Sequence, residues 1–345
     1  MAAPLRVGVY YRNDDVRVEE RPVPEIGSGA LPVKVWASGI CGSDVMEWYR
    51  ISRAPLVLGH EIGGEVVSTG SGVQEFNVGD RVFVSHHVPC NICHYCLKDH
   101  HSTCAMLKTT NFDPGGFSEF VRIPAINVTN GTFKLPASMG YEEAVFIEPL
   151  GCVYRGQRRA GIHAGDTVAV LGSGLTGLLH IRLAKALGAG MVLASDVLKS
   201  RLAAASDCGA DECCMAEDDL VTRLRSCNDG KLADVVIVAT GAPPALEQAF
   251  DLVDAGGTIL FFAPSTPDFM LPMPFNRLWA DEVSIVTTYA ASPKDIKVAI
   301  ELIRTGRVPV KDLISHRFPL SQIQEGFSLV ADPVDSLKVI IEPQR

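Results

Sequence analysis

A thiol, an imidazole and a carboxylate occur at positions that could share one metal ion. Cys41 precedes the segment Gly59-His60-Glu61-Ile62-Gly63-Gly64, in which His60 and Glu61 are adjacent. Zinc accepts sulfur, nitrogen and oxygen ligands, and a mixed set of this kind can leave one position open for water or substrate. The segment therefore predicts a catalytic zinc site.

The loop Cys41-Gly42-Ser43-Asp44 offers two groups that could support this site. The hydroxyl of Ser43 could pass a proton, and the carboxylate of Asp44 could hold the ring of His60 through its second nitrogen. Such a turn is weak evidence alone, since Gly, Ser and Asp are common in loops. Its weight comes from the Gly-His-Glu segment in the same chain.

A further carboxylate belongs to Glu148, within the apolar run Ile147-Glu148-Pro149-Leu150. A buried carboxylate needs a partner, and zinc is an adequate one. The alternative is a glutamate at a helix start with proline in the first turn. Cys152, one helical turn later, is the competing ligand.

Four cysteines indicate a second metal site. Cys90, Cys93, Cys96 and Cys104 are separated by two, two and seven residues. Thiolates at such spacing converge on tetrahedral zinc, and an all-sulfur set is closed and structural. Disulfides are the alternative, disfavoured by the spacing and by a reducing compartment. The histidines of this stretch are interpreted as a polar surface without a ligand role: His86, His87, His94, His100 and His101.

The segment Val170 to Gly177 follows an expected strand and opens an expected helix, which is the context of a dinucleotide-binding loop. Gly172 permits the tight turn, Gly174 lets backbone approach a pyrophosphate, and Gly177 allows close helix packing. Leu175 and Thr176 are expected to bind the cofactor beside the start of the expected helix, Gly177 to Leu187, whose N-terminus attracts phosphate.

Asp196 ends the next expected strand. A carboxylate there can bind ribose hydroxyls and repels a 2′-phosphate, which favours NAD over NADP. The nearby Lys199 and Arg201 temper this preference, and a role of Asp196 as helix N-cap is the alternative. Thr240, after another apolar strand, is expected to line the adenosine side.

Composition supports small-molecule chemistry. The chain has 345 residues, 47% hydrophobic, and a net charge of −9. No basic block indicates nucleic acid and no apolar run has membrane-spanning length, so we expect no nucleic-acid or membrane partner. The metal-type cysteine spacing and the absence of a signal-peptide pattern favour a cytoplasmic protein.

The hydrophobic pattern changes near residue 151. Short alternating strands broken by Gly and Pro predict a mostly β domain before it. After it, apolar strands alternate with helices, which predicts a parallel sheet with crossover helices up to about residue 290. The tail, with an expected strand over residues 338–341, should return to pair with the first domain.

The chain resembles the zinc-dependent medium-chain dehydrogenases, in the branch of sorbitol, galactitol-phosphate and threonine dehydrogenases. The resemblance covers essentially the whole chain. It rests on these elements: Gly59-His60-Glu61 with Gly64 and Gly70, the four-cysteine segment, Ile147-Glu148-Pro149, the glycine loop, and Ser315 to Leu320.

The resemblance implies an α/β protein in which a GroES-like, mostly β catalytic domain (residues 1–150 and 291–345) surrounds an inserted Rossmann domain (residues 151–290). It places the structural zinc lobe at about residues 86–108. It implies two zinc ions per chain, with Cys41, His60, Glu61 and Glu148 serving the catalytic one. The catalytic groups are then Ser43, Asp44, Glu61 and Glu148.

The implied reaction is hydride transfer between a secondary alcohol and NAD, with zinc polarising the oxygen and Ser43 receiving the proton. Two departures bear on it. Met46 stands where many relatives carry a proton-relaying histidine, and Thr287-Thr288-Tyr289 stands where sorbitol dehydrogenases often carry an Arg-Tyr pair. The proton route and sorbitol itself are thereby put in doubt.

We therefore predict an NAD-dependent alcohol or polyol dehydrogenase that forms a homo-oligomer. L-Threonine 3-dehydrogenase activity is the close alternative. A non-catalytic, zinc-stabilised binding protein of the same fold is the alternative from another class.

Overall fold

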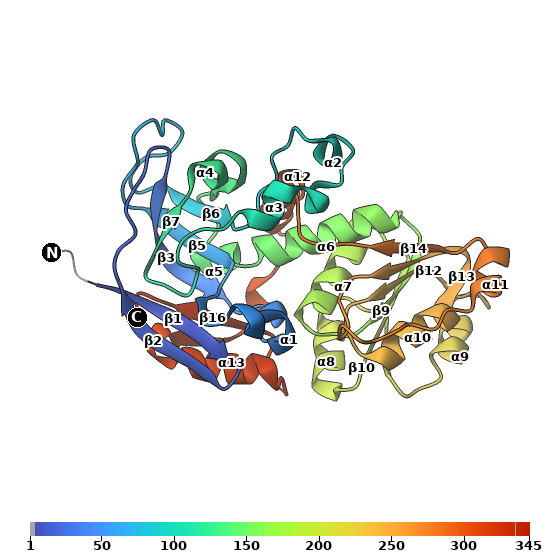
Figure 1. Cartoon of the computed structure of the whole chain (residues 1–345). Coiled ribbons are helices and arrows are strands. Elements are labelled where there is room, and N and C mark those ends of the chain that lie inside the picture. Colours follow the sequence, from blue (N-terminus) through green and yellow to red (C-terminus); the bar gives the residue numbers. More distant parts are fainter. Residues whose placement is uncertain (1–3, 335) are drawn as a thin grey trace. The chain divides into compact units, whose positions relative to one another are not determined.

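The structure is a computed structural model that describes residues 4–334 and 336–345. The chain divides into two compact units. The first comprises the chain up to Gly151 and the segment Ala290–Arg345, and the second is Cys152–Tyr289. In Figure 1 the first unit is coloured from blue to green and, in its C-terminal segment, from orange to red, and the second unit runs from green to orange.

The first unit is built on two sheets. A three-stranded antiparallel sheet has the order β2 (Asp15–Arg21), β1 (Leu5–Arg12), β4 (Leu56–Val57). A larger sheet has the order β15 (Ile314–Pro319), β16 (Lys338–Glu342), β3 (Leu31–Gly39), β5 (Glu61–Val66), β6 (Arg81–Ser85), β8 (Thr132–Lys134), and β7 (Phe120–Ile123) also pairs with β3.

Alternating burial explains why β3 forms a strand of this larger sheet. Val33 and Val35 are inaccessible to solvent. Because successive side chains of a strand point to opposite faces, these two, with one residue between them, point to the same face of the sheet. They pack with Ile62 of β5 and with Val82 and Val84 of β6 in one apolar cluster. This apolar cluster anchors β3 and β5, and the loops with Cys41 and His60 adjoin the ends of these two strands.

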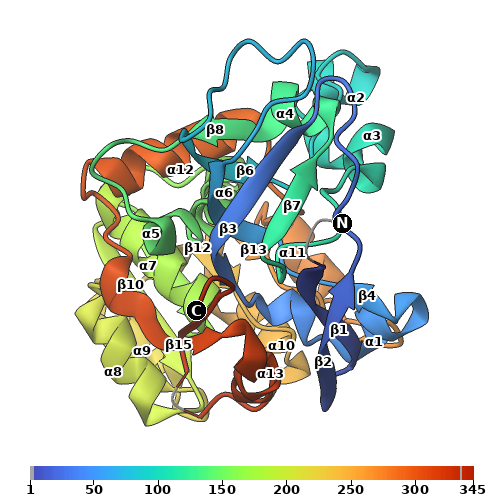
Figure 2. The same cartoon turned by 90° about the vertical axis from the view of Figure 1, so that its left-hand side faces the viewer.

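The end of the chain completes the larger sheet, as the sequence predicts. β16 pairs antiparallel with β3, with Ile340 opposite Gly39 and Ile341 opposite Ser38. It also pairs in parallel with β15. Helix α13 (Ile323–Ala331) packs on β15 and β16 (Figure 2).

Short helices and one long amphipathic helix complete the first unit. They are α1 (Glu47–Arg50), α2 (His94–Leu97), α3 (Ala105–Thr109), α4 (Ala125–Gly131), α5 (Tyr141–Ala144) and α12 (Pro293–Arg304). Helix α6 (Ile147–Ala160) runs from the first unit into the second.

The second unit is a six-stranded parallel sheet. Its order is β11 (Glu212–Met215), β10 (Met191–Asp196), β9 (Thr167–Leu171), β12 (Ala233–Val238), β13 (Val253–Phe261), β14 (Ser284–Thr287). The connecting helices are α7 (Leu175–Leu187), α8 (Lys199–Asp207), α9 (Leu220–Cys227), α10 (Pro243–Leu252) and α11 (Phe275–Ala280).

This strand order is that of the Rossmann fold, in which the order reverses beside the first strand and cofactors bind at that switch point. Here the first strand is β9, between β10 and β12. The predicted fold class, a mostly β domain plus a doubly wound parallel sheet, is confirmed. Within the described part of the chain, no helix is both long and apolar enough to cross a membrane.

Candidate active site

The loop after β3 and the start of β5 bring the predicted ligands together. Gly39 at the end of β3 pairs with Glu61 at the start of β5, so Cys41 follows one strand and His60 precedes the other at the same sheet edge. One ligand atom each from Cys41, His60 and Glu61 lies within 4.8 Å of the others. Glu148 belongs to the first turn of α6 and is not among these three converging side chains.

Cys41 is held by its own loop. It precedes a short 3-10 helix, Gly42–Asp44, and its backbone N–H donates to Oδ2 of Asp44 at 3.0 Å. The Cys41 Sγ in turn accepts from the N–H of Ser43 at 3.5 Å. The backbone N–H of Ser43 therefore holds the Cys41 sulfur in place.

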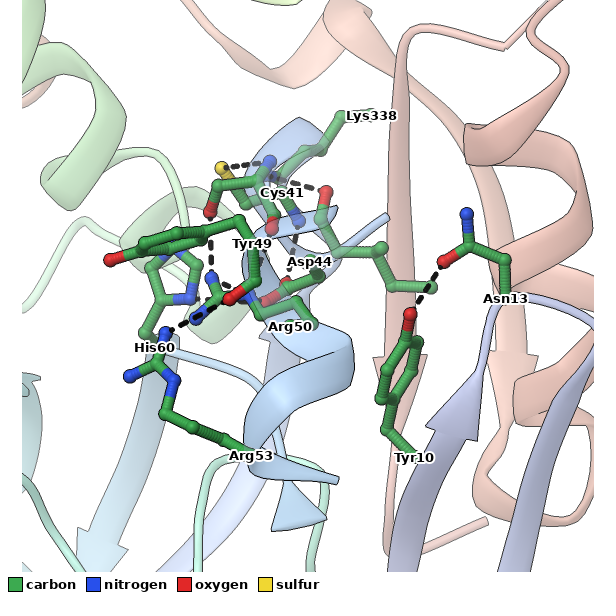
Figure 3. Close-up of polar contacts among 11 residues, drawn as sticks. Tyr10, Asn13, Cys41, Asp44, Tyr49, Arg50, Arg53, His60 and Lys338 are labelled. Carbon is green, nitrogen blue, oxygen red and sulfur yellow. Dashed lines mark hydrogen bonds and ion pairs between the residues drawn. The ribbon is translucent and has the colours of Figure 1, made fainter. Parts of the chain in front are cut away.

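Asp44 is fully buried and contacts His60 and Arg50 (Figure 3). Its Oδ1 lies 3.3 Å from Nδ1 of His60 and 3.4 Å from a guanidinium nitrogen of Arg50. Burial alone would raise the pKa of Asp44, but His60 and Arg50 hold it below its ordinary value. Burial opposes charge on His60, yet the Asp44 carboxylate raises the pKa of His60 well above its ordinary value. Nδ1 of His60 thus faces Asp44, which leaves Nε2 for another partner.

Arg50 also contacts Ser43. Its Nε donates to the Ser43 carbonyl at 2.8 Å, and a terminal nitrogen donates to Ser43 Oγ at 3.0 Å. The Ser43 oxygen accepts this bond, so its own hydrogen stays available to donate elsewhere. This contact of Arg50 with Ser43 was not predicted from the sequence.

Glu61 pairs with a residue that the sequence did not single out. Its Oε2 accepts from Nζ of Lys338, on β16, and both residues have no solvent exposure. Nζ also lies 3.4 Å from the carbonyl of Ile40. The second oxygen, Oε1, is buried and has no hydrogen-bond partner among the described residues. A buried carboxylate oxygen without a donor is an orphan that a metal ion would satisfy.

Two histidines at the end of β6 lie beside His60. The ring centroids of His60 and His86 are 4.8 Å apart, and those of His86 and His87 are 3.9 Å apart. Burial lowers the pKa of His87 to about 4 and that of His86 well below its ordinary value. Assigning these two histidines to a polar surface with the cysteine segment was therefore wrong. The pairing of Glu61 with Ser85 places them here.

The four predicted sulfur ligands converge in a separate lobe. The Sγ distances are 3.5 Å for Cys93 to Cys96, 3.6 Å for Cys104 to Cys90, and 4.0 Å for Cys90 to Cys96. Tetrahedral zinc with Zn–S bonds of about 2.3 Å would set its sulfurs about 3.8 Å apart. The thiols are thus spaced as a closed zinc site requires.

The glycine loop connects β9 to α7. Gly172 has φ of +91°, and a Cβ on Gly177 would lie 1.9 Å from the Gly172 carbonyl oxygen, so neither position accepts a larger residue. Gly174 is the N-cap of α7, which begins with Leu175 and Thr176. A Cβ on Gly174 would meet nothing within 4 Å. The space above Gly174 fits the approach of a pyrophosphate.

Asp196 ends β10 and is tied to this loop. Its Oδ2 accepts from Ser173 N at 2.8 Å and its Oδ1 from Leu198 N at 3.0 Å. Arg201 lies 3.7 Å from the same carboxylate. Thr240, beyond β12, packs against Gly172, since a Cβ there would lie 3.0 Å from the Thr240 Cβ. The structure thus brings Gly172, Asp196 and Thr240 to the carboxyl ends of adjacent strands.

Known proteins share the sequence of this chain in part. Two family models match, the alcohol dehydrogenase GroES-like domain over residues 27–137 and the zinc-binding dehydrogenase over residues 176–305. The sorbitol dehydrogenase of Bacillus subtilis strain 168 is 31% identical over 99% of this chain and 98% of its own. The chain belongs to the zinc-dependent medium-chain dehydrogenase family. Within it, the chain falls in the sorbitol dehydrogenase-like branch.

Solved medium-chain dehydrogenases have the same fold. The alcohol dehydrogenase of Thermus sp. ATN1 superimposes with a TM-score of 0.86 at 30% identity, covering 98% of this chain and 99% of that one. A zinc-binding dehydrogenase of Sinorhizobium meliloti 1021, solved with NADP bound, gives 0.88 at 27% identity, covering 99% and 100%. This medium-chain dehydrogenase is thus an alcohol or polyol dehydrogenase.

Proposed function

We propose that this dehydrogenase oxidises a secondary alcohol to a ketone and reduces NAD. The alcohol class comprises polyols, cyclitols, sugar phosphates and amino alcohols. The convergence of Cys41, His60 and Glu61 carries the proposal. The alcohol carbon gives up a hydride and the hydroxyl gives up a proton, so the products are a ketone, NADH and one proton.

The side chains fit a zinc ion of the catalytic kind. Thiolate, imidazole and carboxylate are all zinc ligands, and the unpartnered Oε1 of Glu61 supplies a free lone pair. Glu148 is proposed as the second carboxylate, binding the metal or its water in alternation with Glu61. When bound, zinc supplies a Lewis acid at the alcohol oxygen and NAD supplies the hydride acceptor.

Ser43 is proposed to take the proton from the alcohol. Arg50 donates to Ser43 Oγ and keeps the hydroxyl in place. A guanidinium cannot accept a proton at neutral pH, and Met46 cannot carry one, so neither relays it onward. The proton then leaves through water or a cofactor ribose hydroxyl.

The second unit is proposed to bind NAD at the glycine loop. The N-terminus of α7 and the open space above Gly174 suit the pyrophosphate. Asp196 sets a fixed negative charge where a 2′-phosphate would lie, which supports NAD over NADP. Arg201, 3.7 Å from that carboxylate, reduces this repulsion.

We infer two zinc ions per chain, the second held by the four cysteines of the lobe. All ten cysteines are free thiols, which supports a reducing, cytoplasmic compartment.

A homo-oligomer is also proposed. The strand β14 forms an edge of the parallel sheet, and the nearby Met270, Phe275 and Trp279 are 86%, 69% and 75% exposed. Light scattering should then give a multiple of the 37.1 kDa chain mass.

The test is NADH formation by the zinc-loaded enzyme across secondary alcohols that include polyols, cyclitols and L-threonine. Turnover that is abolished in Ser43→Ala and in His60→Ala supports the proposal. Preference for L-threonine would assign the amino alcohol class. No turnover of any secondary alcohol, with two zincs bound, would favour a binding protein of the same fold.

A further inference from the structure

The carboxylate at the end of β10 is held by backbone groups around it. Oδ2 of Asp196 accepts from the N–H of Ser173 at 2.8 Å, and Oδ1 accepts from the N–H of Leu198 at 3.0 Å. The Asp196 side chain is only 4% exposed. Its charge therefore acts on a bound cofactor, but little of its surface is left to accept a hydrogen bond from a ribose hydroxyl.

Arg201 lies beside this carboxylate and has a donor without an acceptor. Its Nε is buried and has no hydrogen-bond partner among residues 4–334 and 336–345. A terminal nitrogen, Nη1, is 3.7 Å from Oδ2 of Asp196, which is longer than a hydrogen bond. The Arg201 side chain is 20% exposed, so a ligand can reach it from solvent. A buried donor without an acceptor is costly, and a bound anion would remove that cost.

The ion pair with Asp196 does not account for Arg201. At 3.7 Å the pair lacks the bidentate hydrogen bonds that make an arginine–carboxylate contact strong, and a partly exposed pair contributes little to stability. In the described part of the chain, no other carboxylate lies within ion-pair distance of Arg201. The guanidinium is therefore able to bind a second anion with its remaining N–H groups.

The first turn of α8 is cationic, although a helix start normally favours acids. Lys199 is the first residue of α8 and Arg201 the third, and no acid lies in this turn. The N-cap residue, Leu198, offers no side-chain acceptor. Two cations here oppose the helix dipole, because backbone N–H groups at a helix start carry partial positive charge. The same arrangement favours a phosphate beside Arg201.

We propose that Arg201 binds the 2′-phosphate of NADP and that this dehydrogenase uses NADP as a second cofactor beside NAD. The inference rests on the proposed hydride transfer and widens its cofactor class. The alcohol carbon still gives its hydride to the nicotinamide and the hydroxyl still loses a proton, so the products with NADP are the ketone, NADPH and one proton. The negative charge of Asp196 keeps NAD the better cofactor.

The experiment compares 5′-AMP with 2′,5′-ADP, which differ only in the 2′-phosphate, and so measures binding without alcohol turnover. Isothermal titration of the full zinc-loaded chain should give a dissociation constant for each ligand. We expect 2′,5′-ADP to bind within about 10-fold of 5′-AMP, because Arg201 offsets the repulsion by Asp196. Rising ionic strength should weaken the binding of 2′,5′-ADP more than that of 5′-AMP.

Variants locate the contact. Arg201→Gln should raise the Kd of 2′,5′-ADP about 10- to 100-fold, the range of one charge-assisted hydrogen bond, and that of 5′-AMP far less. Arg201→Lys should recover part of that loss. Arg225→Gln, which removes an exposed charge in the last turn of α9, is the matched control and should leave both dissociation constants unchanged.

Two binding results would overturn the inference while the proposed oxidation of an alcohol with NAD stands. One is binding of 5′-AMP without detectable binding of 2′,5′-ADP. The other is an equal loss of affinity for both ligands in Arg201→Gln, which would assign Arg201 a structural role after β10. Kinetics separate the two proposals further. Turnover with NAD but none with NADP would remove this inference alone, whereas no turnover with either cofactor would remove the proposed function as well.

Discussion

Lys338 and Glu61 form an ion pair in which neither side chain is more than 1% exposed. The lysine lies on β16 and the glutamate on β5, with β3 between these two strands. Gly39 of β3 makes the contact possible. A Cβ there would lie 2.3 Å from Glu61 Oε2 and 2.5 Å from Lys338 Cε.

Replacing Lys338 should therefore destabilise the first unit strongly. In Lys338→Met the carboxylate of Glu61 is buried without a counter-charge, which costs about 3–5 kcal/mol. Calorimetry of the unfolding of the first unit would measure this loss of stability. The double variant Lys338→Met, Glu61→Gln removes both charges and should recover part of it. Equal stability of the single variant and the wild type would contradict the assigned ion pair.

Zinc content should separate the two metal sites. The wild-type chain is expected to bind two zinc ions, measured by elemental analysis after exhaustive dialysis. Cys104→Ser should lose the structural ion and His60→Ala the catalytic one, so each should retain one. Because the four cysteine sulfurs converge in this lobe, loss of an ion between them in Cys104→Ser should also make residues 90–104 more sensitive to limited proteolysis. Retention of two ions in either variant would reassign that residue.

Cofactor choice should depend on the charge of Asp196. Asp196→Asn keeps an oxygen that can accept from backbone N–H groups but removes the negative charge. We expect the kcat/KM ratio of NAD to NADP to fall about 10-fold or more, because repulsion of the 2′-phosphate is lost. Asp196→Ala, which also loses the loop contacts, should bind both cofactors poorly. An unchanged ratio in Asp196→Asn would show that the carboxylate only supports the loop.

Acid should weaken the second unit through His180. This residue of α7 is fully buried, and burial lowers its pKa from 6.5 to about 3. The unfolded chain therefore binds a proton below pH 6.5 that the folded chain excludes. The free energy of unfolding that depends on the neutral ring is fully present above pH 6.5. Below pH 6.5 it falls with decreasing pH, by up to about 1.4 kcal/mol per pH unit.

Thermal unfolding at pH 7.5 and pH 5 would measure this effect. His180→Gln should have a smaller difference between the two midpoints than the wild type, because glutamine does not titrate. Its absolute stability should be lower, since the contacts of His180 with Gln157 and Phe262 are altered. The same pH difference in both proteins would assign the acid sensitivity to other groups.

Local patterns predicted much of the fold and the ligand set. The apolar run over residues 167–171 is β9, and the helix expected from residue 177 begins at Leu175 as α7. The four cysteines meet because their spacing is local and short. In each case the residues that decide the outcome are close together in the sequence, so periodicity and spacing carry the information.

The residues that were missed depend on strand pairing between distant segments. Lys338 begins an apolar strand and is typical of an exposed strand start, and only the order β16, β3, β5 sets it opposite Glu61. His86 adjoins the cysteine segment in sequence, yet the pairing of β5 with β6 directs it to His60. The pairing register of two strands cannot be read from the sequence of either strand alone.

The position of β16 in the sequence also bears on the order in which the protein is made. β5 leaves the ribosome early, whereas β16 follows the whole of the second unit. The parallel sheet can therefore fold during synthesis while Glu61 still lacks Lys338. Until β16 is translated, the carboxylate of Glu61 has no lysine partner and β3 lacks the strand that pairs with its end. Chaperones or strands of other chains can bind at this unpaired part of β3.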